Sequence, residues 1–211
     1  MSDERVAKII ALLKKEYPDV TTALNFSNPL EMLVATILSA QSTDRQVNEV
    51  TKNLFKKYRV PEDYAKAPLE ELEKDIYSTG FYKNKARNIK KMCEILVENF
   101  GGKVPDNMKD LITLPGVARK TANVVLWNAF GKNEGIAVDT HVKRVAARLG
   151  LTANTDPDKI EKDLMRIVPK NEWGIFSLLL IRHGREICVA RKPRCQDCVL
   201  NRICPSAFTF G

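Results

Sequence analysis

Four cysteines near the end of the chain are the residues whose spacing points most directly to chemistry. Cys188, Cys195, Cys198 and Cys204 follow the pattern C-x6-C-x2-C-x5-C within 17 residues. Four thiolates in one loop predict a metal centre, either one tetrahedral zinc ion or an iron–sulfur cubane with one cysteine per iron. Zinc sites usually combine two C-x2-C pairs, and only one pair here has that spacing. The uneven spacing therefore favours a [4Fe-4S] cluster, with zinc as the alternative.

A lysine at the start of a predicted helix is the second candidate for chemistry. The stretch LPGVARKTANVVL, residues 114 to 126, places Arg119 and Lys120 in the first turn of that helix. A helix start carries partial positive charge and disfavours a further ammonium group. This charge and Arg119 together favour the neutral amine of Lys120, which is the nucleophilic form. The alternative is a lysine that contacts phosphate.

The turn before that helix is suited to binding phosphate. Pro115 and Gly116 reverse the chain between two helical patterns, and the small residues Gly116 and Ala118 leave backbone N–H groups accessible. Free N–H groups at a helix start bind anions. The alternative is a plain corner between two helices, which often contains a glycine.

Helices must position these residues, because the chain shows helical periodicity and no convincing alternating strand. We predict an all-α protein packed as helical layers. The polar segment GKNEG, residues 131 to 135, is the best candidate for a domain boundary. The ten predicted helices lie at about 2–15, 30–40, 43–58, 68–77, 84–100, 106–113, 118–130, 138–150, 155–168 and 171–188.

The net charge narrows the class of partner. Lys and Arg number 34 against 26 Asp and Glu among 211 residues, so the formal charge is +8. That balance favours a polyanion such as nucleic acid, with a merely soluble basic protein as the alternative. The basic stretch YKNKARNIKK, residues 82 to 91, is expected to be mostly a solvated helical face that in part meets phosphate.

The start of the chain and its apolar segments indicate a cytoplasmic protein. The N-terminal stretch lacks the pattern of a signal peptide, and the apolar segment at 30 to 40 is too short to span a bilayer. Cytoplasmic thiols stay reduced, so the cysteines are not expected to form disulfides. The fifth cysteine, Cys93, shares an apolar helical face with Ile89 and Leu96 and is expected to be buried.

Several motifs together resemble one family of DNA repair enzymes. The hairpin LPGVARKTANVV, the downstream AVDTH at 137 to 141, ILSAQSTD at 37 to 44 and the four-cysteine loop occur in the same order as in the endonuclease III DNA glycosylases. These enzymes belong to the helix-hairpin-helix-GPD superfamily. The resemblance covers essentially the whole chain, and the combination is far more specific than any single motif.

The resemblance implies two helical domains flanking a DNA-binding cleft. One domain would cover 22–134 and contain the helix-hairpin-helix at about 106–130. The other would join 1–21 to 135–211 and contain the cluster loop at 188–204. The implied function is base excision repair of double-stranded DNA, associated with the nucleoid and performed by a monomer. A bifunctional enzyme would remove oxidised pyrimidines and cleave abasic sites by β-elimination through a lysine Schiff base.

The resemblance also assigns residues to the reaction. Lys120 corresponds to the catalytic lysine and Asp139 to the catalytic aspartate, while the four cysteines correspond to ligands of a [4Fe-4S] cluster that is not the catalyst. Asp139 directly precedes a predicted helix, so its alternative role is that of an N-cap alone. We expect both roles, because a fixed carboxylate can also stabilise an oxocarbenium-like sugar. His141 either orders that carboxylate or simply packs, and His183 is expected to be structural.

Other residues are implied in holding DNA. Gly116, Ala118 and Arg119 would meet the backbone phosphate at the hairpin. An enzyme that extrudes a base must also fill the gap. Gln41 is implied to enter the vacated space and Phe81 to wedge the opposite strand. The alternatives are a solvated amide for Gln41 and a core residue at a helix end for Phe81.

Two departures from the family pattern affect the expected substrate preference. Ala118 stands where many relatives have a second hairpin glycine, which is tolerable if the residue is helical, and GKNEG lacks a proline often found before the aspartate. Two other functions compete with the leading one. A mismatch-directed glycosylase of the same superfamily tends to have Ser or Tyr in place of Lys120. A non-catalytic DNA-binding module would show salt-dependent binding without strand scission.

Overall fold

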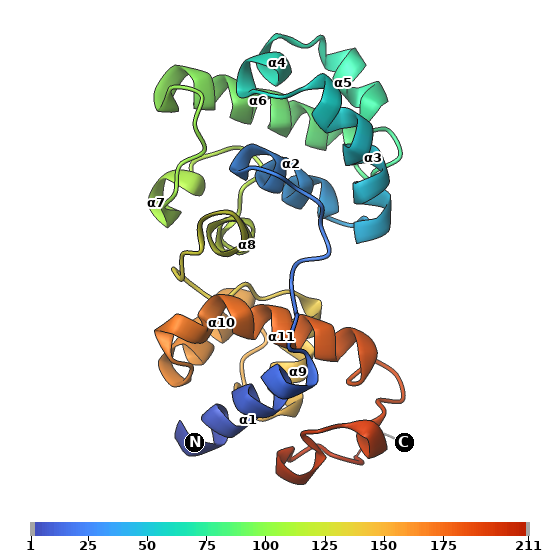
Figure 1. The fold of residues 1–211 in the computed structure, drawn as a ribbon, viewed down its shortest axis with the longest axis vertical. Helices are drawn as coiled ribbons and strands as arrows, with labels where there is room; N and C mark the ends of the chain where they lie inside the picture. The colour runs from blue at the N-terminus through green and yellow to red at the C-terminus, as the bar shows by residue number, and fades with distance from the viewer. Residues whose placement is uncertain (1–2, 210–211) are drawn as a thin grey trace. The chain divides into compact units, whose positions relative to one another are not determined.

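The computed structural model describes residues 3–209, and within this range every regular element is a helix (Figure 1). The predicted all-α class is therefore confirmed. None of the described helices is long and apolar enough to cross a membrane. The α-helices are α1 (Asp3–Glu16), α2 (Pro29–Ser39), α3 (Asp44–Lys57), α4 (Pro61–Lys66), α5 (Leu69–Asp75), α6 (Tyr82–Phe100), α7 (Met108–Leu111), α8 (Arg119–Phe130), α9 (Thr140–Arg148), α10 (Pro157–Ile167) and α11 (Trp173–Glu186), and the 3-10 helices are η1 (Lys170–Glu172), η2 (Cys195–Asp197) and η3 (Asn201–Ile203).

The chain divides into two compact units, each with its own hydrophobic core. Thr22–Lys132 forms one unit, and the segments before and after it form the other. The division falls inside the segment GKNEG, and residues 1–2 and 210–211 of the expected second domain lie outside the described residues. The position of DNA in a cleft between two domains stays a prediction.

Helix α2 lies at the centre of the unit formed by Thr22–Lys132. Asn28 caps it through a hydrogen bond from Glu31 N (3.0 Å), and Pro29 occupies its first position. Its residues from Met32 to Leu38 are all buried because α3, α6 and α8 pack around it. Thr43 caps the start of α3 by accepting from Gln46 N (3.2 Å).

Helix α6 lies across the same unit and differs at its start from the prediction. It begins at Tyr82 rather than at residue 84, and it ends at Gly101, whose φ of 58° makes a left-handed C-cap. Cys93 is fully buried in it, as predicted, and burial raises the pKa of the thiol. The helix packs on α4, which the sequence prediction missed although Pro61 at the first helical position is a start signal.

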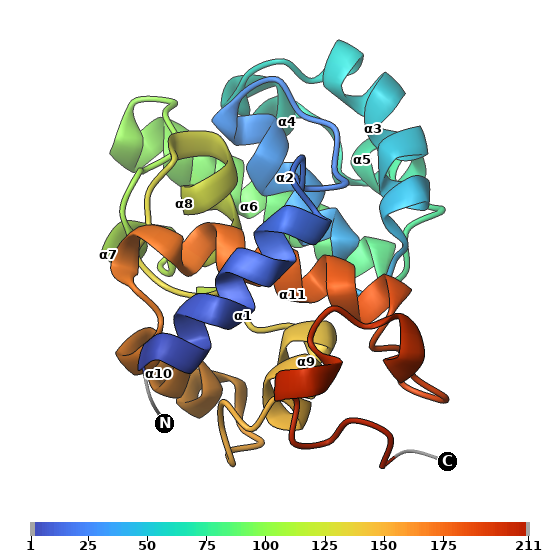
Figure 2. The ribbon, with the colours of Figure 1, turned by 60° about the horizontal axis from the view of Figure 1, so that its bottom comes forward.

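The second unit contains α1, α9, α10 and α11 (Figure 2). Helix α11 packs closely against α9 and also contacts α1. Gly184 allows the close approach to α9, because a Cβ there would lie 3.1 Å from His141 Cβ and from Val145 Cγ2. Asp156 caps α10 through a hydrogen bond from Lys159 N (3.0 Å), and Pro157 follows it at the first helical position. This packing holds the start of α9 and the cysteine segment in one unit.

Candidate functional site

The predicted hairpin is present in the unit formed by Thr22–Lys132. Helix α7 is shorter than the predicted 106–113, because Asn107 caps it by accepting from Asp110 N (3.0 Å). The turn that follows includes Gly116 at a φ of 79°. A Cβ at Gly116 would lie 3.1 Å from Asn88 Cβ on α6. Glycine is therefore required twice here, once for the left-handed backbone and once for the close approach to α6.

Helix α8 starts without the side chains that usually neutralise a helix start. Ala118 is its N-cap and makes no side-chain capping bond, and the first turn contains no acidic residue. The N-cap side chain therefore accepts no backbone N–H group at this end. Ala118 is extended (φ −82°, ψ 168°) rather than helical. The expectation that alanine is tolerated here in place of the family's second hairpin glycine because the residue is helical is therefore wrong. The negative φ of Ala118 suits alanine without that condition.

Lys120 lies exposed in the first turn of α8. Within residues 3–209, no hydrogen bond or ion pair involves its ammonium group. A lysine held by a carboxylate would be fixed in its charged form, whereas this amine is available to react. The hairpin thus presents one unpaired amine beside a helix start that favours anions.

Asp139 is the N-cap of α9, as predicted. Its Oδ1 accepts from His141 N and from Val142 N, both at 2.8 Å. Among the described residues no donor contacts Oδ2, so one carboxylate oxygen is fixed by the helix and the other is left to interact. Nδ1 of His141 lies 3.2 Å from a guanidinium nitrogen of Arg144. Burial lowers the pKa of His141, which keeps its ring neutral beside that cation.

Gln41 and Phe81 are both exposed and both adopt left-handed backbone conformations. Their φ angles are 53° and 57°, and Phe81 retains 64% of its accessible surface. The alternative role of Phe81 as a core residue is therefore wrong. Left-handed conformations are strained for residues other than glycine, and strain of this kind persists where surrounding contacts impose it.

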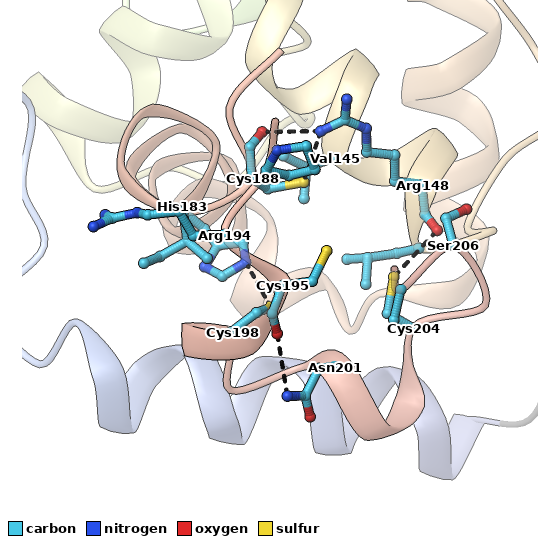
Figure 3. Close-up of a pocket in the computed structure, with 14 residues that line it drawn as sticks. Val145, Arg148, His183, Cys188, Arg194, Cys195, Cys198, Asn201, Cys204 and Ser206 are labelled. Carbon is cyan, nitrogen blue, oxygen red and sulfur yellow. Dashed lines mark hydrogen bonds between the residues drawn. The ribbon is translucent and has the colours of Figure 1, made fainter. Parts of the chain in front are cut away.

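The four cysteines line one cavity in the second unit (Figure 3). They reach it from the segment after α11, from η2 and its end, and from the end of η3. The remaining lining includes the apolar side chains of Val145 and Leu149 on and beside α9. Among the described residues, no three His, Cys, Asp or Glu side chains group closely enough to hold a single metal ion. Thiols spread around a cavity fit a cluster in which each sulfur binds a different metal atom.

The surroundings of these thiols make their ionised forms dependent on a metal. Burial, with a smaller contribution from the other three thiols, raises the pKa of Cys198 to about 11. Burial likewise raises the pKa of Cys204. Because thiolate is the form that binds metal, the positive charge of bound iron is what stabilises ionisation in this cavity. The residues present therefore fit a polynuclear cationic group.

Comparisons with known proteins agree with this geometry. Residues 34–170 match the model described as "HhH-GPD superfamily base excision DNA repair protein". The chain belongs to this superfamily. Residues 188–204 separately match the iron–sulfur binding domain of endonuclease III, so this HhH-GPD protein carries a [4Fe-4S] cluster in its C-terminal loop.

Relatives of known name extend the likeness over the whole chain. The endonuclease III of Synechocystis sp. is 53% identical, with 97% of this chain and 93% of that protein covered. A solved structure of a trapped endonuclease III–DNA covalent intermediate is 47% identical with a TM-score of 0.93, covering 99% of this chain and 98% of that one. A thermostable thymine-DNA glycosylase is 26% identical with a TM-score of 0.89, covering 98% of each chain. This HhH-GPD protein is therefore a base excision repair enzyme, a DNA glycosylase with lyase activity.

Two arginines of α9 hold the cysteine segment of this HhH-GPD protein, and the sequence prediction missed both. Arg148 donates to Val189 O (2.7 Å) and lies 3.4 Å from the sulfur of Cys188. Arg144 donates to Cys188 O (3.0 Å). Both lie about 40 residues before the loop, so only their position on the polar face of a predicted helix could have indicated them.

His183 lines the cluster cavity and contacts Tyr17, the residue that directly follows α1. Burial lowers its pKa to about 4, so the ring is neutral at neutral pH. Burial raises the pKa of Tyr17 to about 12, so its hydroxyl stays protonated 3.1 Å from His183 Nδ1. With the hydroxyl donating to Nδ1, the other nitrogen, Nε2, is left to donate to the sulfur of Cys198 at 3.4 Å. Such outer contacts orient metal ligands.

Proposed function

We propose that this enzyme removes oxidised pyrimidines from duplex DNA and cleaves the resulting abasic site, with Lys120 as the nucleophile. The observation that supports this most is the exposed, unpaired Lys120 amine in the first turn of α8, where the helix start lacks any acidic residue. Among the described residues no carboxylate holds this amine, and the helix start beside it favours an anionic substrate. The proposal includes a monomer acting on nucleoid DNA in the cytoplasm.

The reaction then follows from the chemistry of an amine at a sugar carbon. Nζ of Lys120 forms a bond to C1′ of the damaged nucleotide, the bond from C1′ to the base breaks, and the base leaves with the electron pair and takes a proton. Opening of the sugar ring gives a Schiff base between Nζ and C1′. Loss of a proton from C2′ then expels the 3′ phosphate, and water releases the lysine. Each step uses the same amine, so glycosylase and lyase activities belong to one residue.

Asp139 supplies the carboxylate for this chemistry. Its Oδ1 is occupied by two backbone N–H groups at 2.8 Å, which fixes the orientation of Oδ2. A fixed anion stabilises the positive charge that develops on the sugar as the base departs. The same oxygen can also help to transfer protons. We propose Asp139 as the second catalytic residue of this reaction.

The hairpin and two exposed side chains hold the DNA in this proposal. Backbone N–H groups around Gly116 and Ala118 bind a phosphate at the start of α8, and Arg119 adds positive charge there. Gln41 fills the space left by the extruded base, and Phe81 wedges the opposite strand. The exposure of both side chains supports these roles.

We further propose that Cys188, Cys195, Cys198 and Cys204 are the four ligands of the [4Fe-4S] cluster, which supplies charge and cross-links the loop. Replacing Cys198 by serine is expected to remove most of the iron and the absorbance band near ~400 nm, because one thiolate is then missing. Iron analysis and absorbance spectra measure this. Cys93→Ala is the matched control, since Cys93 is buried in the other unit, and it should keep its full iron content. A colourless unaltered protein with one zinc ion would contradict the assignment.

A panel of duplexes, each with a single lesion, tests the proposed function. We expect borohydride to trap a covalent complex with DNA containing thymine glycol or an abasic site, because reduction fixes the Schiff base. Undamaged duplex should give no complex. The panel includes a T·G mismatch, since the likeness to a thymine-DNA glycosylase makes mismatch repair the second candidate. Excision from T·G without strand cleavage, and no trapping on thymine glycol, would show that the second candidate is correct.

A further inference from the structure

One lysine of the basic stretch at 82–91 points into the protein instead of toward solvent. Lys85 on α6 is only 5% exposed, and its ammonium group donates to Leu38 O (2.8 Å) and to Ser42 Oγ (3.2 Å). The expectation of a mostly solvated face is therefore wrong at this position. A buried lysine is rare because removing its charge from water is unfavourable.

The groups that Lys85 contacts belong to the end of α2 and the loop that follows it. Leu38 O is one of the last carbonyl groups of α2, where positive charge is favoured. The loop then passes through Gln41 to Ser42. Burial lowers the pKa of Lys85 to about 8, and no carboxylate contributes to this shift. The lysine thus donates to a backbone carbonyl and to a hydroxyl group, and among the described residues it forms no ion pair with a carboxylate.

The same serine also holds the loop that contains Phe81. Ser42 Oγ accepts a hydrogen bond from Gly80 N (3.1 Å) as well as from Lys85. A Cβ at Gly80 would lie 3.1 Å from Gln41 O, so the two loops touch along their backbones. Lys85, Ser42 and Gly80 therefore join the loop of Gln41 to the loop of Phe81.

Both exposed residues of these loops need such support. Gln41 and Phe81 have φ angles of 53° and 57°, and neither conformation is favoured by a residue with a side chain. Contacts from the surroundings must hold them there. Phe81 precedes α6 directly, and Lys85 lies one turn later on the same helix, so one helix carries both the wedge and its support.

We propose that Lys85 is a positioning residue that fixes Gln41 and Phe81 relative to each other, so that both enter the duplex together when the damaged base is extruded. This inference rests on the proposed function, in particular on the roles of Gln41 and Phe81. Opening a base pair is unfavourable, and side chains that are already ordered lose little further freedom when they fill the gap. Without Lys85, the bond from Gly80 N would be the only one left to hold Ser42 across the two loops, among the residues that the structure describes. Gln41 and Phe81 would then be less well fixed relative to each other.

The inference predicts a defect that depends on whether the lesion is paired. For Lys85→Met we expect single-turnover excision from a fully paired duplex to fall about 10- to 100-fold. Excision of the same lesion from a single strand should stay within about 3-fold of the unaltered protein, because nothing has to be opened. Ser42→Ala, which removes the shared acceptor, should show the same difference. Combined with Phe81→Ala, Lys85→Met should add little further loss, since both changes affect one step.

Lys90 provides a matched control on the same helix. Its ammonium group donates to Ala65 O near the end of α4 and to Ala67 O (2.9 Å) just after that helix. Both acceptors lie away from Gln41 and Phe81. Lys90→Met should reduce thermal stability as Lys85→Met does, while preserving the ratio of paired to single-strand activity. A readout without chemistry is the fluorescence of 2-aminopurine placed beside the lesion, which rises when the base stack opens. We expect Lys85→Met, and not Lys90→Met, to slow that rise.

Three results would overturn the role of Lys85. These are an equal loss on paired and single-stranded DNA, no loss on either, and an unchanged fluorescence rise in Lys85→Met. Failure of the proposed function is distinguishable, since the unaltered protein would then cleave neither substrate. In that case the fluorescence comparison still decides whether Lys85 controls opening of the duplex.

Discussion

Replacing Lys120 by glutamine is expected to abolish Schiff base trapping and to reduce excision at least about 1,000-fold, because the amide cannot form a bond to C1′. The structure leaves the Lys120 amine exposed and unpaired at the start of α8, so the substitution breaks no described contact. Folding should therefore be unchanged. Borohydride trapping on a duplex with one abasic site measures the effect, and thermal unfolding confirms that the variant is folded.

Lys109 supplies the control for charge. It lies exposed on α7 of the same hairpin, and Lys109→Gln removes the same positive charge without removing the amine at the start of α8. Both variants should lose some DNA affinity, with a weaker dependence on salt. Only Lys120→Gln should lose trapping. Undiminished trapping in that variant would show that another residue is the nucleophile.

Asp139→Asn is expected to separate catalysis from stability. Asparagine caps helices as well as aspartate, so the free energy of unfolding should change by less than about 0.5 kcal/mol. The negative charge that stabilises the sugar is lost, so single-turnover excision should fall about 100-fold or more. Asp139→Ala should show the same loss of rate and, in addition, about 1 kcal/mol of lost stability from the missing cap. Denaturant unfolding and single-turnover kinetics measure the two effects separately.

Asp156 is the matched control for capping in the same unit. It begins α10 as Asp139 begins α9, and it accepts from Lys159 N at 3.0 Å. Asp156→Ala should reduce stability by about 1 kcal/mol and leave excision unchanged. If Asp139→Asn kept full activity, Asp139 would be a helix cap and nothing more.

Local signals predicted most helices because caps and breaks depend on neighbours in the chain. Asn28 with Pro29, Thr43 and Asp156 begin helices where their residue types indicate, and Gly101 ends α6. The prediction was wrong for short elements. Helix α4 has only 6 residues, which is too few to show an apolar period, and α7 has only 4 of the expected 8.

The groups proposed for the chemistry could be predicted from the order of residues alone, because each lies within one short segment. Four cysteines within 17 residues can meet around one cavity whatever the rest of the fold, and Lys120 follows the hairpin turn directly. Asp139 is fixed by the helix that it caps. Spacing along the chain is therefore enough to indicate the cluster loop, the amine and the carboxylate.

The residues that hold these groups in place could not be predicted in this way, because they depend on packing between distant segments. Arg148 reaches a loop 41 residues later, and Lys85 reaches a carbonyl group 47 residues earlier. Long charged side chains are usually solvated, so residue type predicts exposure for both, and the helical pattern of the basic stretch hides the one lysine that points inward. Packing reverses the preference of Lys85 for solvent. The end of α2 and the start of α6 come together, and the buried ammonium group donates to a backbone carbonyl and a hydroxyl group there.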